Sequence, residues 1–202
     1  MRNLSLAACV LLVGALGACG GPQGDVTVAI AAHVAQPGPS ALSAIGPVAV
    51  SVADLSEAGG TGVLPGRIGE RKTLGDLSLG LITVTPTPGA IVAEALRAEL
   101  AAAGAKLVAP GAGAAAITGA IRQFSVRTDV TAFYWDIVGT TAATVTATRD
   151  GRSHSSDYAA TCKDRTYVYP TGLLIGQVVR ACVGDLARQF RNDAAMARLL
   201  GG

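Results

Sequence analysis

Aromatic and charged residues are scarce in this sequence. Of its 202 residues, 4% are Phe, Trp or Tyr and 15% are charged, although half are hydrophobic. A core built from such a composition must rely mostly on Val, Ile, Leu and Ala. The 16 basic and 14 acidic residues give a formal net charge of +2. Because nucleic-acid-binding proteins usually carry a basic stripe, we expect no nucleic-acid partner.

Histidine is rarer still, since the chain has two, His33 and His154. A histidine metal site would need both, and no His/Cys cluster accompanies the cysteines, so we expect neither a metal nor a cofactor. The segment 153–157 reads Ser-His-Ser-Ser-Asp and contains every residue type of a hydrolase triad. In a strand, however, His154 and Asp157 project from opposite faces and cannot meet. We therefore expect no enzymatic activity, with a hydrolase as the residual alternative.

The N-terminus lacks a hydrophobic run long enough to span a membrane, because its apolar stretch covers residues 4–16 and spanning needs about 20 residues. This stretch follows Arg2 and leads into Leu-Gly-Ala-Cys at 16–19, which resembles the lipobox of bacterial lipoproteins. The resemblance implies a signal peptide over residues 1–18 and a lipidated Cys19, with a diacylglycerol on the thiol and a further acyl chain such as palmitate on the amino group. Several acyl chains anchor a protein stably to a membrane.

Removal of residues 1–18 leaves 184 residues with a formal net charge of +1, enough for one domain with a real core. We expect residues 19–25 to form a lipidated tether and residues 26–202 to form a single periplasmic domain. In the lipoprotein sorting pattern, a residue other than Asp after the anchor cysteine favours the outer membrane, and this chain has Gly20 there. The resemblance thus implies a lipid-anchored protein of the outer membrane that faces the periplasm, with the inner membrane as the alternative.

Cysteine is also infrequent, with four in the chain. Cys9 would be lost with the signal peptide and Cys19 would be alkylated, which leaves Cys162 and Cys182 as the free pair. Two thiols in an oxidising compartment predict a disulfide, and two buried reduced thiols are the alternative. Closing a loop of about 20 residues would stabilise the fold by roughly 3 kcal/mol.

Hydrophobic periodicity predicts an α+β fold in which two main helices cover one face of an antiparallel sheet, followed by a short C-terminal helix. Strand patterns cover residues 26–34, 48–54, 117–126, 130–149 and 152–166. One helix is predicted from a Thr87 cap and Pro88 to a terminator at Gly104. A second helix covers residues 171–191, and Asp193 can cap the short one that ends at Leu200.

The dipeptide Asp150-Gly151 is a strong signal for a two-residue hairpin. Without a bulge, the numbers of paired residues sum to 301, which predicts a polar face of Thr144, Thr146 and Thr148 opposite Asp157, Ser155 and Ser153. The other face would present Ala143, Val145, Tyr158, Ala160 and, by the same parity, Cys162. The stripe of the second helix likewise places Cys182 on a buried face, so the two thiols are predicted to lie on neighbouring inward faces.

Two groups of residues are candidates for a ligand or partner surface. Parity places Phe133 and Trp135 on the core side of their strand and leaves Tyr134 and Asp136 on the opposite face, where they could bind a partner. Residues 56–75 are rich in glycine and predict a long, mobile loop that carries Arg67, Arg71 and Lys72. These three cations are predicted to be solvated or to bind an anionic envelope ligand such as a glycan or a lipid phosphate.

Together, the order and spacing of these features resemble the YajG-like family of uncharacterised outer-membrane lipoproteins. The matching features span most of the mature chain: the lipobox, the strand at 48–54, the Arg-Ile-Gly segment at 67–69, the helix from 87 to 104, and the closing helix with Asp193 and a Leu-Leu pair at 199–200. This chain has Ser56 where that family tends to have Arg, and the Cys162/Cys182 pair is not part of the family pattern.

The resemblance implies a fold and an address, and it carries over no catalytic residue because that family has no established reaction. We therefore expect a lipid-anchored envelope protein with a non-enzymatic accessory or protein-interaction role and an envelope protein as partner. A module that binds peptidoglycan or lipid is the alternative.

Overall fold

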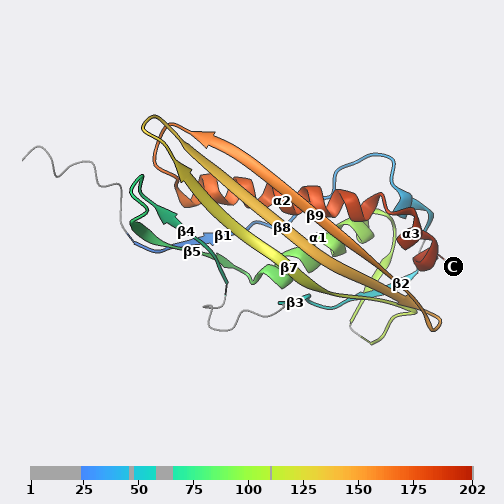
Figure 1. Ribbon diagram of the computed structural model, residues 1–202. Coiled ribbons are helices and arrows are strands. Elements are labelled where there is room, and N and C mark those ends of the chain that lie inside the picture. The colour runs from blue at the N-terminus through green and yellow to red at the C-terminus, as the bar shows by residue number, and fades with distance from the viewer. Residues whose placement is uncertain (1–23, 46–47, 58–65, 110, 202) are drawn as a thin grey trace, which may run out of the picture.

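The computed structural model describes residues 24–45, 48–57, 66–109 and 111–201. The expected signal peptide and the anchor Cys19 lie outside these ranges. Within them the chain forms nine strands, three α-helices and a short 3-10 helix (Figure 1). None of the helices in the described ranges is long and apolar enough to cross a membrane.

The strands are β1 Val26–Ala29, β2 Ala49–Val52, β3 Ser56–Glu57, β4 Arg67–Lys72, β5 Ser78–Thr85, β6 Lys106–Val108, β7 Ala115–Val130, β8 Trp135–Arg149 and β9 Arg152–Thr166. The helices are α1 Pro88–Ala102, α2 Gly172–Arg191 and α3 Ala194–Gly201, and the 3-10 helix is Ala41–Ala44.

The long strand β7 organises the sheet. One edge of β7 pairs antiparallel with β8, and β8 pairs antiparallel with β9. The other edge is shared by three short strands, β2, β3 and β4, which run parallel to β7 and pair with it in turn at residues 115–117, 120–121 and 126–127. Beyond these, β6 extends the sheet beside β2, while β5 and β1 extend it beside β4.

The prediction of a purely antiparallel sheet is therefore wrong, although part of the sheet is antiparallel. The three long strands β7 to β9 are antiparallel, but β1, β2, β3, β4 and β6 each make a parallel pairing, so the sheet is mixed. A parallel pairing needs a crossover connection, and the chain from β2 to β7 passes through α1. Strands of two to six residues show too little alternation to reveal their direction.

The predicted hairpin is confirmed residue by residue. Every pair in the β8–β9 ladder sums to 301, including Thr144 with Asp157 and Thr146 with Ser155. Asp150 and Gly151 both adopt positive φ, 50° and 74°, as a two-residue turn of this kind requires. The face that carries Ala143 is buried against the helices, as expected.

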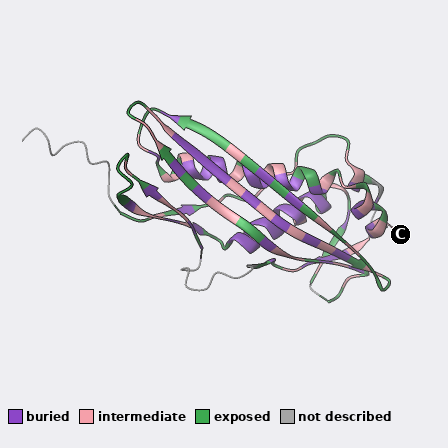
Figure 2. Ribbon diagram, viewed as in Figure 1, coloured by how far each residue is buried: buried purple, intermediate pink, exposed green. Residues whose placement is uncertain are grey.

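The two main helices and the short C-terminal helix are also confirmed. Thr87 caps α1 by accepting a hydrogen bond from the Ala90 amide, and Gly104 ends the helical segment with φ of 90°. Both α1 and α2 pack on the same face of the β7–β9 strands. Figure 2 shows the buried residues of these helices and strands in purple. The predicted stripe of α2 is buried throughout: Ile175, Val179, Cys182, Leu186 and Phe190.

The loop expected over residues 56–75 is replaced in part by regular structure. Residues 56–57 form β3 and residues 67–72 form β4, while residues 58–65 lie outside the described part of the chain. The charged residues at 67 and 70–72 give this strand the composition of a solvated loop. Strand β4 is nevertheless held in the sheet through Ile68, which is buried, and Gly69, whose Cα approaches the Val126 carbonyl. A Cβ at position 69 would lie 1.9 Å from that carbonyl oxygen.

Candidate functional site

The sheet topology gathers three connections and the start of the described chain at one end of the molecule (Figure 1). Strands β4, β7 and β9 run in one direction and end there, whereas β1, β5 and β8 begin there. We call this end the tip and define it by residues 73–77 between β4 and β5, residues 131–134 between β7 and β8, and residues 167–173 after β9.

The β7–β8 turn of the tip is held by one side chain. Thr131 Oγ1 accepts hydrogen bonds from the amides of Phe133 and Tyr134, at 3.2 and 3.1 Å, and donates to the Tyr134 carbonyl at 3.0 Å. Phe133 projects from this turn and is 83% exposed. Its prediction as a core residue is wrong, because the strand stops at Val130 and parity does not extend through the turn. Parity holds again from Trp135, which is half-buried.

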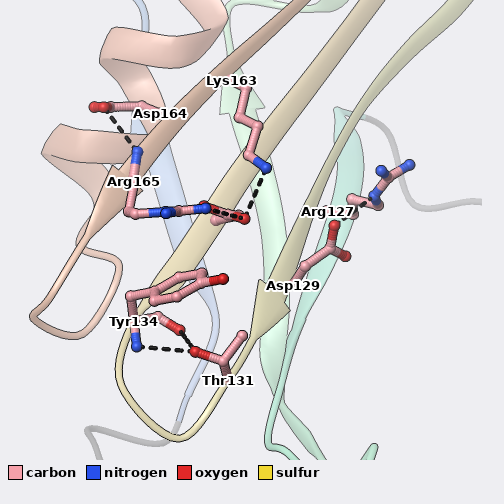
Figure 3. A network of polar contacts seen from close by, with 8 residues as sticks. Arg127, Asp129, Thr131, Tyr134, Lys163, Asp164 and Arg165 are labelled. Carbon is pink, nitrogen blue, oxygen red and sulfur yellow. Dashed lines mark hydrogen bonds and ion pairs between the residues drawn. The ribbon is translucent and has the colours of Figure 1, made fainter.

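Asp136 forms the centre of a polar network with Lys163 and Arg165, the two cations labelled in Figure 3. Its Oδ1 accepts from Arg165 Nε at 2.8 Å, and its Oδ2 accepts from Arg165 Nη2 at 3.2 Å and lies 2.7 Å from Lys163 Nζ. The hydrogen bonds from Arg165, and then those from Lys163, lower the pKa of Asp136 to about 2. Asp136 is 7% exposed and its carboxylate is engaged by two cations, and its role as a binding group stays a prediction.

Tyr134 is joined to the same network through its ring. The Arg165 guanidinium lies 3.8 Å from the centre of the Tyr134 ring, and Tyr167 meets Tyr134 edge-on with ring centres 6.5 Å apart. The structure thus brings the predicted pair Tyr134 and Asp136 together, with Arg165 between them. Tyr167, which is 76% exposed, continues this aromatic surface to the end of β9.

Arg71 is not a surface cation, which corrects the sequence-based expectation. It is 2% exposed, its guanidinium donates to the Gly24 carbonyl, and it lies 5.0 Å from the centre of the Tyr169 ring. The Tyr169 ring in turn packs edge-on against Trp135 at 5.5 Å. Arg71 therefore ties the start of the described chain to the core of the tip.

The other two predicted cations have acidic neighbours on the surface. Arg67 lies 4.0 Å from a carboxylate oxygen of Glu70, and Lys72 Nζ lies 3.5 Å from Asp76 Oδ1. Exposed pairs of this kind contribute little to stability. With Arg71 buried, the three residues do not form the anion-binding cluster that the sequence suggested.

Cys162 and Cys182 are neighbours, and both are free thiols in the structure. Cys182, on α2, donates to the Gly139 carbonyl at 3.3 Å, and Gly139 pairs with Cys162 across β8 and β9. Burial, reinforced by a hydrogen bond with the Cys162 thiol, raises the pKa of Cys182. The predicted adjacency of the two thiols is present, and the disulfide between them stays a prediction.

A second polar cluster joins β9 to the α2–α3 corner. Ser156 Oγ donates to Asp193 Oδ2 at 2.7 Å, as does the Tyr158 hydroxyl at 2.8 Å, and His154 Nε2 lies 3.1 Å from Ser156 Oγ. Burial by itself would raise the pKa of Asp193. Hydrogen bonds from the Met196 amide and from these two hydroxyls outweigh burial and lower the pKa to about 2. A hydrolase triad needs histidine between serine and aspartate. Here the serine lies between the other two, and its hydrogen goes to the carboxylate.

His33, the other histidine, belongs to a different group of contacts from His154. Its Nε2 lies 2.9 Å from Glu99 Oε1, and Arg191 Nε lies 3.9 Å from Glu99 Oε2. This buried group fastens the segment after β1 to α1 and α2. No cluster of three or more metal-ligating side chains is found among the described residues.

The family comparison decides what kind of protein this is. The model of a family described as uncharacterised lipoprotein matches residues 71–200. The chain belongs to this lipoprotein family. Among curated protein sequences, none matches the chain.

Several solved structures are similar to the lipoprotein, and one of them shares its fold. Protein XCC0632 from Xanthomonas campestris has a TM-score of 0.56 at 11% identity, with 86% of this chain and 96% of that chain covered. A putative lipoprotein from Caulobacter crescentus CB15 has a TM-score of 0.38 at 14% identity, covering 80% and 93% of the two chains. Lipoprotein GNA1162 from Neisseria meningitidis has a TM-score of 0.34 at 14% identity, covering 67% and 94%. The fold argument rests on the first.

Sequence reasoning did not assign to a surface site four residues at or beside the tip of the lipoprotein: Phe133, Lys163, Arg165 and Tyr167. For Arg165 a signal was present, because the hairpin rule pairs it with Asp136, and the structure has that pair. For Phe133 and Tyr167 no signal was available, since both lie in connections where strand periodicity ends.

Proposed function

We propose that this lipoprotein is anchored to the outer membrane through acyl chains on Cys19 and acts without catalysis, as an accessory that contacts a protein partner in the cell envelope. Membership of a lipoprotein family and the lipobox at 16–19 support the anchor. The narrower YajG-like affiliation is part of this proposal. The outer membrane as destination follows from Gly20 in the sorting pattern.

The observation that carries the accessory role is the uncovered face of the long strands. Helices α1 and α2 cover one face of β7–β9, and the other face carries polar side chains, many of them Thr and Ser. Hydrogen bonds already order several of them: Thr146 Oγ1 and Ser155 Oγ lie 2.7 Å apart, and Arg122 Nε donates to Thr144 Oγ1 at 2.9 Å. Side chains that are already ordered lose little conformational entropy when a partner covers them.

A photo-crosslinking experiment in the native membrane tests this role. A probe at Ser155 samples the uncovered face, and a probe at Ala181 on the exposed side of α2 serves as the matched control. We expect a discrete protein adduct from position 155 that is weak or missing from position 181. Glycan or lipid adducts alone at position 155 would replace the accessory role with the ligand-binding alternative.

The anchor is tested separately by fractionation. Replacing Cys19 with Ser removes the thiol that carries the lipid, so we expect the protein to leave the membrane fraction. Density-gradient separation of inner and outer membranes then gives the address of the unmodified protein. Membrane association that survives Cys19→Ser would contradict lipidation as the anchor.

A peptidoglycan- or lipid-binding module remains the second candidate, and one observation favours its lipid form. Of the three cations first expected to bind the ligand, Arg71 is buried in the interior. The tip, in contrast, exposes Phe133 and Tyr167, and aromatic side chains are typical of membrane interfaces.

A further inference from the structure

We propose that the tip docks on the surface of the membrane that holds the lipid anchor, with its apolar and aromatic side chains at the level of the lipid headgroups. This inference rests on the proposed lipidation of Cys19. It assigns to the tip a role that goes beyond anchoring, because it fixes the orientation of the whole domain on the membrane.

The length of the tether is the first argument. Gly24 is held at the tip by a hydrogen bond from its amide to the Leu79 carbonyl at 2.9 Å and by the Arg71 guanidinium on its carbonyl. Four residues separate Gly24 from Cys19, and the five Cα–Cα steps between them span at most about 18 Å when extended. A lipid on Cys19 therefore keeps the tip close to the bilayer.

The distribution of exposed apolar side chains is the second argument. Eight large hydrophobic side chains are exposed in the described part of the chain, and six of them belong to the tip. Scattered surface apolar residues are normal, but a concentration at one end marks a contact surface. Five come from the three connections and the sixth from the first turn of α2: Leu74, Leu77, Phe133, Tyr167, Val168 and Leu173.

Local hydrogen bonds hold these side chains outward. Thr131 fixes the turn that displays Phe133. Thr166 does the same for the next connection, since its Oγ1 accepts from the Val168 amide at 3.2 Å and donates to the Val168 carbonyl at 3.1 Å. The aromatic and apolar side chains are therefore displayed on ordered turns, which lowers the entropy cost of docking.

The charges at the tip indicate which membrane surface it fits. Lys163 and Arg165 share Asp136, and Lys72 Nζ lies 3.5 Å from Asp76 Oδ1. Arg127 Nε lies 3.1 Å from Asp129 Oδ2 (Figure 3). Each of these four cations already has a carboxylate partner, so an excess of anionic lipid is not required. We infer docking driven by interfacial aromatic and apolar contact, with weak dependence on salt.

The lone tryptophan of the chain makes a direct test feasible. The lipoprotein is produced in bacteria with its signal peptide, purified in detergent and reconstituted into phosphatidylcholine vesicles whose acyl chains carry bromine, a contact quencher of tryptophan. In a Trp135→Phe background, one variant carries Phe133→Trp at the tip. The matched control carries Leu107→Trp, because Leu107 is also exposed but lies on β6, at the far end of the sheet.

We expect the emission of the tip variant to fall several-fold in brominated vesicles relative to ordinary vesicles, in low and high salt alike, while the control stays unchanged. The protein could bind the vesicles and yet show the same emission of the tip variant in brominated and in ordinary vesicles. That result would overturn the docking and leave the anchor intact. Protein that stays out of the vesicle fraction would overturn the anchor, and the docking with it. In the native membrane, a probe at position 133 that crosslinks to protein instead of lipid would also overturn docking.

A second variant avoids any replacement of Trp135. Phe133→Asp places a charge on an exposed side chain, so we expect the fold to be kept, as circular dichroism would verify. In the brominated vesicles, quenching of Trp135 should be weaker in this variant than in the unmodified lipoprotein. Unchanged quenching would count against the docking of the tip.

Discussion

Gly139 and Cys162 lie opposite each other across β8 and β9, and Gly139 faces Val178 and the Cys182 thiol on α2. A Cβ at position 139 would lie 3.4 Å from Cys182 Sγ and 3.0 Å from a methyl of Val178. The glycine thus lets α2 approach the sheet closely. As a result, one thiol from the helix meets one from the edge strand.

We expect this pair to form a disulfide in the oxidising cell envelope. Mass spectrometry of non-reduced peptides should show Cys162 linked to Cys182, and reductant should lower the free energy of unfolding by roughly 3 kcal/mol. The Cys162→Ser variant is the control, because its stability should not respond to reductant. Alkylation of both thiols without reductant would refute the disulfide.

The stability of the lipoprotein should fall in acid through Asp136. Its pKa in the folded protein, about 2, lies below the ordinary value of 3.8. Its carboxylate therefore contributes stability above about pH 4, and this contribution is lost as the pH falls toward 2. We expect the urea midpoint of the unmodified protein to drop as the pH falls from about 4 to 2. The urea midpoint of Asp136→Asn should be lower at about pH 4 and should drop less over the same range.

Asp193 titrates in the same range, with a pKa of about 2, so the acid response must be divided between the two groups. Asp193→Asn removes the second contribution and serves as the comparison. The double variant should show the flattest pH dependence. If Asp136→Asn alone had the same slope as the unmodified protein, its ion pairs with Lys163 and Arg165 would not contribute to stability.

The hairpin and the helices could be predicted because each depends on local chemistry. Asp150-Gly151 sets the turn, and the turn sets every pair of the β8–β9 ladder. Thr87 and Gly104 likewise mark the ends of α1 by capping and by a positive φ. Such signals are complete within a few residues, so a sequence is enough to read them.

The arrangement of the short strands could not be predicted in the same way. Strand β4 carries Arg67, Glu70, Arg71 and Lys72, a composition typical of a solvated loop, yet its pairing with β5 and β7 buries Arg71. That burial depends on Gly24 and Tyr169, which are distant in sequence. Arg71, chosen by its charge, was therefore misplaced, whereas the pairing rule would have located Arg165.

Gly80 is expected to be needed for the position of the tether. It has a φ of 130°, and a Cβ there would lie 2.1 Å from the Gly24 carbonyl oxygen. Gly80→Ala should lower the free energy of unfolding by more than the roughly 1–3 kcal/mol typical of a strained residue. It should also expose the chain near residue 24 to protease. Gly111→Ala is the control, because Gly111 also has positive φ but nothing lies within 4 Å of its Cβ position. Equal losses in both variants would rule out the contact with Gly24 as the cause.

Gln189 is expected to protect the free edge of the sheet. Strand β9 pairs with β8 alone among the described strands, and Gln189 on α2 covers its other edge by donating to the Ala159 carbonyl at 2.7 Å and accepting from the Ala159 amide at 3.4 Å. An uncovered edge offers unpaired backbone groups to another chain. Gln189→Ala should therefore shift the protein to larger species on size exclusion as its concentration rises. Gln123→Ala, which removes an exposed glutamine bonded to Ser125 on β7, should not. If the two variants elute alike, the edge is protected by its charged and polar side chains, and the amide of Gln189 serves only to fix α2 against β9.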